Sequence, residues 1–197
     1  WTSSAAFCDN LHQQAEEMNP NVSQERMDTL RTIGETLNYS GYGNSEDDLI
    51  AQPIDVYEDM AQYRNPFNYF RRSRLFHSIH DQMLADKEQL SRSTVLFDEE
   101  FGMVVQLPDT VASSRYSGIY SNALAMNNPD KAFAILTING DDFKVSIRAP
   151  INRPTGAVKL ANQFTTGGGR EKAAGINVLP QNKIHEFYSG FNDIFNI

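Results

Sequence analysis

Apolar residues in the first half of the chain recur at the spacing of helices rather than strands. Residues 23–37, 53–63 and 73–90 each place apolar side chains three or four positions apart, which is typical of amphipathic helices. The first eight residues differ from the rest of this half. Trp1 to Cys8 is a run of small and apolar residues, and it predicts a buried strand.

At about Val95 the pattern changes to a mixture of strands and helices. Apolar or alternating stretches predict four strands, and three further segments have helical spacing. The predicted strands are residues 101–107, 132–138, 143–149 and 173–179, and the predicted helices are residues 113–127, 155–164 and the C-terminal segment from Ile184. Asn139-Gly140 between two of the strands is a strong hairpin signal. The predicted fold class is therefore α/β, with a helical N-terminal part at residues 1–94 and a mixed β-sheet domain with flanking helices at residues 95–197.

Length and composition fit a folded chain of one large domain or two small ones. Hydrophobic residues make up 40 % of the 197 positions, and no window approaches the roughly 18 consecutive apolar residues of a membrane span. The single cysteine, Cys8, excludes an intramolecular disulfide framework and a cysteine-rich zinc site. Since no signal-peptide pattern is visible, we expect a cytoplasmic protein without membrane partners.

Charge is unevenly distributed along the chain. The net charge is −8, yet residues 1–100 hold 8 Lys or Arg against 18 Asp or Glu, while residues 101–197 hold 9 against 7. Duplex nucleic acid is not an expected partner, because duplex binding needs many phosphate contacts from basic side chains. A small anion held by the second half is compatible with these numbers, and so is an acidic face that only aids solubility.

The clearest local signal for chemistry is Thr166-Gly167-Gly168-Gly169-Arg170. Three successive glycines in a loop let backbone N–H groups approach an anion without Cβ atoms in the way. Arg170 adds a guanidinium group suited to phosphate or carboxylate. Arg148 is a second candidate, because strand alternation places it on the polar face of residues 143–149. Each feature also has a purely structural explanation: a loop that needs positive φ, and a solvated arginine on a strand.

Taken together, these segments resemble the C-terminal substrate-binding domain of DHH-superfamily phosphoesterases. That family has a strand with Ser-x-Arg, a helix, Gly-Gly-Gly-His and then Ala-Ala-Gly. The matching segments are Val145 to Arg148, Gly167 to Arg170 and Ala173 to Gly175. The chain departs from the family at Arg170, where most relatives have His, so a permanent cation replaces an imidazole.

The resemblance covers about residues 95–197 and implies a site for the phosphate or terminal nucleotide of a substrate. The residues that it assigns to this site are Arg148, Gly167, Gly168, Gly169 and Arg170. Arg115, at the Ser-rich start of a predicted helix, is a further candidate. The implied ligand is a small phosphorylated substrate or a short oligonucleotide.

The segment Ala5 to Asp9 is similar to the last metal-binding motif of the family, an apolar strand that ends in an Asp ligand. The resemblance implies that Asp9 is one carboxylate of a two-metal site, in which Mn²⁺ or Mg²⁺ activates water and holds the phosphoryl group. The alternative is an Asp that caps the next helix. The family's Asp-x-Asp and Asp-His-His motifs do not occur in the sequence. We therefore expect a C-terminal fragment that is inactive alone, with the metal ions used by the full-length protein.

The expected function is substrate binding within a metal-dependent phosphoesterase that hydrolyses phosphodiester or phosphoanhydride bonds. The alternative is a non-enzymatic anion- or nucleotide-binding regulatory module. The whole sequence also resembles a bacterial subgroup sometimes labelled acetyltransferases, through Asp9 to His12, Leu37 to Gly43 and Thr166 to Arg170. An acetyl-CoA loop should follow a strand, whereas its nearest match, Arg31 to Thr36, lies in a segment with helical spacing.

Overall fold

The structure, a computed structural model, describes residues 1–196. The chain divides into two compact units, of which the first is Trp1–Glu88 and the second begins at Gln89. The division falls a few residues before Val95, near which the sequence pattern changes from helical to mixed. Each unit is described separately below.

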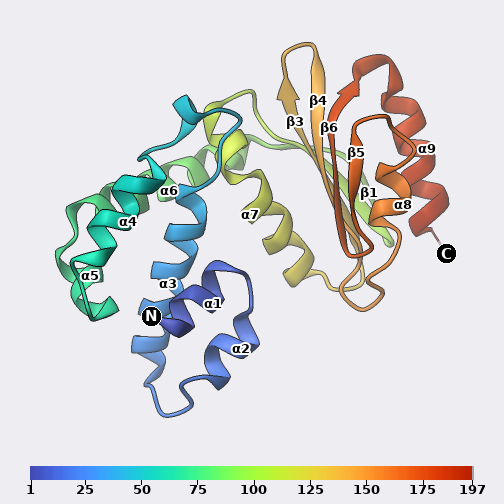
Figure 1. The fold of residues 1–197 in the computed structure, drawn as a ribbon. Coiled ribbons are helices and arrows are strands. Elements are labelled where there is room, and N and C mark those ends of the chain that lie inside the picture. Colours follow the sequence, from blue (N-terminus) through green and yellow to red (C-terminus); the bar gives the residue numbers. More distant parts are fainter. Residues whose placement is uncertain (197) are drawn as a thin grey trace. The chain divides into compact units, whose positions relative to one another are not determined.

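The first unit is helical (Figure 1). Its α-helices are α1 Thr2–Cys8, α2 His12–Glu17, α3 Gln24–Ser40, α4 Pro53–Ala61, α5 Pro66–Arg72 and α6 Arg74–Gln89, with a short 3-10 turn at η1 Glu46–Asp48. A further 3-10 turn, η2 Leu90–Arg92, lies at the start of the second unit. The three helices predicted from apolar spacing are confirmed as α3, α4 and α6. The apolar positions of α3 are buried as that spacing requires, with Ile33 fully inaccessible to solvent.

The predicted strand at residues 1–8 is wrong, because these residues form α1. A short apolar run does not distinguish a strand from a buried helix. Alanine also favours the helix, having the highest helix propensity. Ser3, Ala6 and Phe7 are buried on one side of α1. The helix ends at Asp9, and the next residue, Asn10, has a φ of 59°, the left-handed conformation that often follows a helix.

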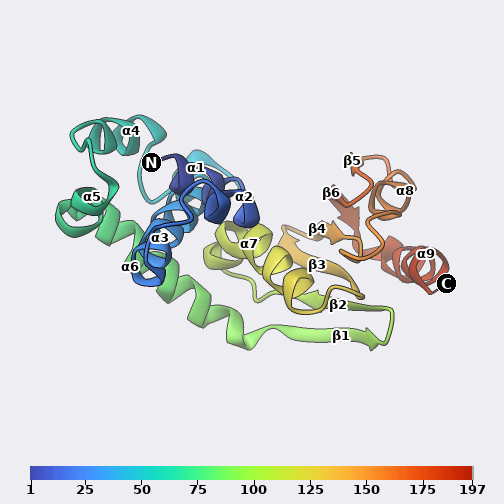
Figure 2. The same ribbon diagram turned by 90° about the horizontal axis from the view of Figure 1, so that it is seen from below.

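The second unit is a six-stranded mixed sheet with helices on both faces, as Figures 1 and 2 show. Its elements are β1 Thr94–Glu99, β2 Gly102–Gln106, α7 Val111–Asn127, β3 Ala132–Asn139, β4 Asp142–Arg148, α8 Ala157–Ala161, β5 Gly167–Arg170, β6 Ala173–Pro180, η3 Gln181–Lys183 and α9 Ile184–Phe195. The strand order is β1-β2-β3-β4-β6-β5, with β2 and β3 parallel and the other neighbours antiparallel. The α/β fold class is confirmed.

The two edge strands are the elements that the sequence pattern did not predict. β1 is exposed along nearly its whole length, so its residues carry little of the alternation that marks a half-buried strand. β5 consists of three glycines and an arginine, a composition that is depleted in strands. The hairpin between β3 and β4 is confirmed, with Asn139 paired to Asp142 across the two-residue turn.

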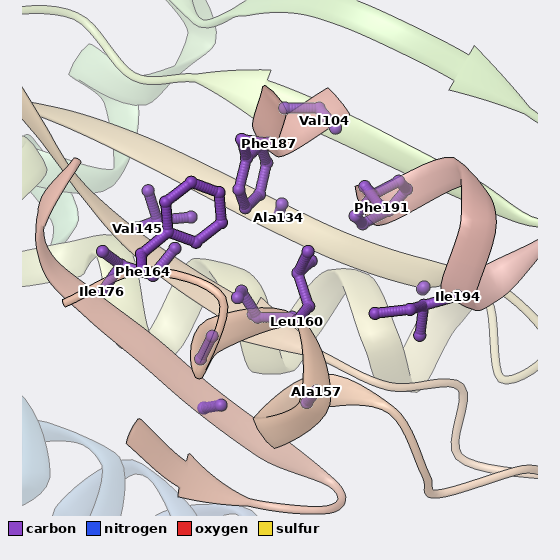
Figure 3. Close-up of a cluster of buried hydrophobic side chains, with 14 of the residues drawn as sticks. Val104, Ala134, Val145, Ala157, Leu160, Phe164, Ile176, Phe187, Phe191 and Ile194 are labelled. Atoms are coloured by element: carbon purple, nitrogen blue, oxygen red, sulfur yellow. The ribbon is translucent and has the colours of Figure 1, made fainter. Parts of the chain in front are cut away.

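The main core of the second unit lies on one side of the sheet. In Figure 3, aromatic side chains from α9 and apolar side chains from α8 meet the buried side chains of the strands. The close-up labels Val104, Ala134, Val145, Ala157, Leu160, Phe164, Ile176, Phe187, Phe191 and Ile194. The other side of β3 and β4 is covered by α7 (Figure 2). Across the described part of the chain, no helix is long and apolar enough to cross a membrane.

Candidate functional site

The candidate site is built on the face of β4 that looks away from the main core. Val145 and Ile147 are buried in that core, so Ser146 and Arg148 point to the opposite side of the sheet. There Arg148 meets α7. Its Nε donates a hydrogen bond to Asn122 Oδ1 at 2.7 Å, and its Nη1 donates to Ser146 Oγ at 3.0 Å. Asn122 and Ser146 thus help to orient the guanidinium group.

The register of the sheet aligns Arg148 with Arg170. Arg148 on β4 and Arg170 on β5 are each paired with the same residue of β6, Ala173. Residues directly opposite one another on neighbouring strands point to the same face. With strands about 4.8 Å apart, the two arginine Cα atoms are separated by about 10 Å. Both side chains therefore start from one row on one face, close enough for their long side chains to reach a common ligand.

A second row on the same face carries almost no side chains. In this row, Ser146 of β4 is paired with Gly175 of β6, and Gly175 is paired in turn with Gly168 of β5. A Cβ atom added at Gly168 would have no heavy atom within 4 Å, so the face is open there. The result is a flat floor of small residues beside the row that holds the two arginines.

The predicted glycine loop is wrong, because Gly167–Arg170 is an edge strand paired with β6. Successive N–H groups of a strand point to opposite sides, so the three glycine amides do not converge on one anion. The Gly167 amide donates instead to the carbonyl of Phe164 at 2.9 Å. Arg170 and the open face at Gly168 remain available for the predicted binding role.

Local packing and backbone conformation explain why positions 167 and 169 are glycine, but they do not explain the glycine at position 168. A Cβ atom at Gly167 would lie 1.8 Å from the carbonyl oxygen of Ala161 in α8. At Gly169, the φ of +144° disfavours any side chain, and a Cβ atom would lie 2.4 Å from Ala174 Cα. The structural explanation therefore holds for Gly167 and Gly169, whereas nothing in the local packing requires glycine at position 168.

Arg115 and Asn122 lie on one stripe of α7. They are seven residues apart, which is two helical turns, so the half-buried Arg115 shares the side of α7 from which Asn122 reaches Arg148. Asn122 was not identified from the sequence. The one signal that could have shown it is its spacing from Arg115 on the predicted helix.

Asp9 does not end a strand. It is an exposed residue at the C-terminus of α1, and its N–H donates to the carbonyl of Ala5 at 3.1 Å. The alternative of an Asp that caps the next helix is wrong too, because the N-cap of α2 is Leu11. Burial raises the pKa of the Cys8 thiol, and the carboxylate of Asp9 raises it further. The Cys8 thiol is therefore kept protonated.

One carboxylate does not make a two-metal site. Among residues 1–196, no group of three or more His, Cys, Asp or Glu side chains is arranged to hold a metal ion. Divalent cations such as Mg²⁺ need several oxygen ligands each. A metal ion at Asp9 would need ligands from outside the described residues, so the described residues do not fit a complete site.

The segment that is nearest to an acetyl-CoA loop lies inside a helix. Arg31 to Thr36 falls in the middle of α3, where Thr36 is fully buried. The backbone N–H groups of a helix interior are used within the helix, so they cannot hold a pyrophosphate. This agrees with the helical spacing of the sequence and gives no support to acetyl transfer.

Comparison with known proteins adds evidence from the fold. No protein-family model and no curated protein matches the sequence. Among solved structures, the chain is similar to the DHH domain of a protein described as a member of a family of ribosomal proteins, with a TM-score of 0.55 and 14% identity, over 97% of this chain and 48% of that one. It is also similar to PggH of Vibrio cholerae, described as a pGpG-specific phosphodiesterase, with a TM-score of 0.55 and 8% identity, over 92% and 64%. RecJ of Thermus thermophilus, crystallised with Mg²⁺, gives a TM-score of 0.53 and 12% identity, over 85% and 25%.

The chain shares its fold with these structures, one of which is described as a DHH domain. The match covers nearly all of this chain but only a quarter to two thirds of each of these three structures. At 8 to 14% identity, the likeness concerns the fold alone. The shared fold agrees with the resemblance drawn from the Ser-x-Arg, Gly-Gly-Gly and Ala-Ala-Gly segments.

Proposed function

We propose that the face of β4, β6 and β5 that carries Arg148 and Arg170, and that is open at Gly168, binds the phosphate group of a nucleotide or a similar small phosphorylated substrate. The observation that carries this proposal is the shared row of Arg148 and Arg170 beside a floor without side chains at Gly175 and Gly168. Guanidinium groups bind phosphate through charge-assisted hydrogen bonds. The flat floor lets a substrate approach the backbone closely.

The proposal also assigns a role to each of the two parts of the chain. Residues 95–197 serve as the substrate-binding domain, and residues 1–94 are the end of a catalytic domain with the helical linker that follows it. In this proposal the full-length protein is a phosphoesterase that uses Mn²⁺ or Mg²⁺, with Asp9 as one ligand. Support comes from the DHH fold, from PggH, described as a phosphodiesterase, and from RecJ, crystallised with Mg²⁺ and with Mn²⁺. A cytoplasmic location remains part of the proposal and rests on the single cysteine.

Arg170 determines which kind of ligand the site can bind. A guanidinium group stays charged throughout the physiological pH range, whereas an unperturbed imidazole has a pKa of about 6.5 and can exchange a proton in that range. Arg170 therefore acts as an anion-binding group and not as a proton donor or acceptor. This favours a terminal phosphate, which carries more negative charge than a diester, as the group that Arg170 contacts.

The test is calorimetric titration of the chain with adenosine monophosphate. Arg170→Ala should weaken binding by about tenfold or more, because a hydrogen bond to a charged acceptor contributes on the order of 1.5–3 kcal/mol. Fold stability should hardly change, since Arg170 is exposed. Arg92→Ala, which removes the same charge at an exposed position outside the site, is the control. Equal affinities of the wild type and Arg170→Ala would refute the proposal.

A further inference from the structure

The basic side chains of the first unit gather around one short helix. Residues 1–88 contain seven Lys or Arg, and five of these are arginines in or near α5 and the start of α3. The five are Arg26, Arg64, Arg71, Arg72 and Arg74. The same residues 1–88 contain 15 Asp or Glu, so these five arginines form a basic cluster within a unit whose net charge is negative.

Three of these arginines line a groove between α3 and α5. Two hollows, with volumes of about 450 and 280 Å³, share Arg26, Asn65 and Phe67 in their walls. Arg71 lines the first hollow and Arg64 the second. The two hollows therefore lie next to each other, and together we call them the α3–α5 groove.

The guanidinium groups of this groove are held by neutral partners. The Arg26 guanidinium lies 4.2 Å from the centroid of the Phe67 ring. Arg71 Nη2 donates to Asn68 Oδ1 at 2.6 Å. Over the described part of the chain, Arg26, Arg64 and Arg71 have no carboxylate oxygen within 4.0 Å. Their charges are therefore not neutralised by ion pairs.

The chemistry of the groove suits a flexible polyanion with aromatic groups. Its walls include Phe67, Phe70 and Trp1, all half-buried. One carboxylate, Glu25, lines the first hollow, which leaves three arginines against one acidic group in the groove as a whole. Arginines that follow a backbone and aromatic rings on which bases stack are the usual elements of single-strand binding.

We propose that the α3–α5 groove binds the phosphate backbone of a single-stranded nucleic acid. Arg26 and Arg71 contact phosphates, and the aromatic side chains in the groove wall contact bases. The groove lies in the first unit, so it is a site separate from the face of β4, β6 and β5, and it does not depend on the proposed function of that face. It gives the protein a means to prefer an oligonucleotide over a mononucleotide.

The test measures binding of a fluorescently labelled single-stranded oligothymidine of about 12 nucleotides to the whole chain by anisotropy, at several salt concentrations. The variant Arg26→Gln/Arg71→Gln should bind at least tenfold more weakly. The slope of log affinity against log salt should fall by about 1.4, since each single-strand phosphate contact contributes about 0.7. Lys87→Gln/Arg92→Gln, which removes two charges at exposed positions outside the groove, is the matched control and should bind like the wild type.

Two further arms separate the possible explanations. Adenosine monophosphate should bind the groove variant as it binds the wild type. If adenosine monophosphate binds neither protein but the groove variant still loses the oligonucleotide, the proposed function fails and this inference stands. Unchanged oligonucleotide affinity in the variant, or equally effective competition by polyglutamate, would overturn it, the latter by showing a surface for acidic proteins.

Discussion

At the residue scale, the account depends on how Arg148 is oriented. The sequence alternation over residues 143–149 predicted which face Arg148 occupies, because the buried positions of that strand are apolar. It could not predict the partner that fixes the guanidinium, since Asn122 comes from a helix 26 residues earlier and meets Arg148 only in the folded sheet. Asn122 is thus a positioning residue of the proposed site.

Replacing Asn122 tests this role. Asn122→Ala removes the acceptor of the Arg148 Nε hydrogen bond, and affinity for adenosine monophosphate should fall about threefold to tenfold, the range expected for one such bond. Asn122→Asp should also weaken binding, because a carboxylate holds Arg148 but neutralises its charge. Calorimetry on both variants measures the effect. If Asn122→Asp binds like the wild type, Arg148 contributes geometry rather than charge, contrary to the proposal.

At the element scale, β5 shows where sequence reasoning reached its limit. The glycine triplet predicts a loop, but the structure places it in a strand, where its three members have different surroundings. Gly167 and Gly169 are required by close contacts with α8 and β6, and Gly168 faces open space. The sequence pattern does not show these contacts, because Ala161 and Ala174 come close to β5 only in the folded structure.

The contrast between two neighbouring glycines gives a prediction. Gly168→Val adds a side chain to the open face, so the melting temperature should stay near that of the wild type while nucleotide binding is lost. Gly167→Ala places a Cβ atom against the Ala161 carbonyl and should lower the melting temperature by several degrees. Thermal unfolding and calorimetry distinguish the two. A Gly168→Val protein that still binds adenosine monophosphate normally would show that the floor is not a ligand surface.

The contact between α3 and α6 predicts a pH dependence of stability. Thr36 Oγ1 and His80 Nδ1 are 3.0 Å apart. Burial lowers the pKa of His80, an effect that Asp81 partly opposes. The unfolded chain therefore takes up the proton more readily, so this contribution to stability is present above about pH 6.5 and is lost as the pH falls through the folded pKa. In urea unfolding at pH 7.5 and 5.5, His80→Gln should lose less stability on acidification than the wild type, and equal losses would contradict the assignment.

At the scale of the whole molecule, the sequence predicted the α/β class and most of the helices and strands. It predicted them because long amphipathic helices and buried strands carry strong periodic signals. The elements that were missed or misassigned include α1 and the edge strands β1 and β5, which are short or exposed and in which periodicity is weak. The resemblance to DHH-superfamily proteins came from a few residues in the right order, and the fold agrees with it.

Metal-dependent hydrolysis is also a property of the whole molecule, because its ligands must come from several elements. With Asp9 as the single assigned ligand, the isolated chain should show no Mn²⁺-dependent hydrolysis of bis-p-nitrophenyl phosphate above the background of the ion alone, because a two-metal site needs several carboxylate or imidazole ligands. A colorimetric assay with and without Mn²⁺, and with Asp9→Asn as control, measures this. Robust turnover that Asp9→Asn abolishes would show that the chain completes its own metal site.

The central claim is that a nucleotide phosphate binds the face of β4, β6 and β5 that carries Arg148, Arg170 and the glycine floor. The most direct measurement is a titration of the ¹⁵N-labelled chain with adenosine monophosphate, followed by backbone amide chemical shifts. The account predicts saturable shifts at Gly168, Arg170 and Gly175, with little change at α9 on the opposite side of the sheet. Shifts confined to α9 or to the first unit, or no saturable shifts at all, would contradict it.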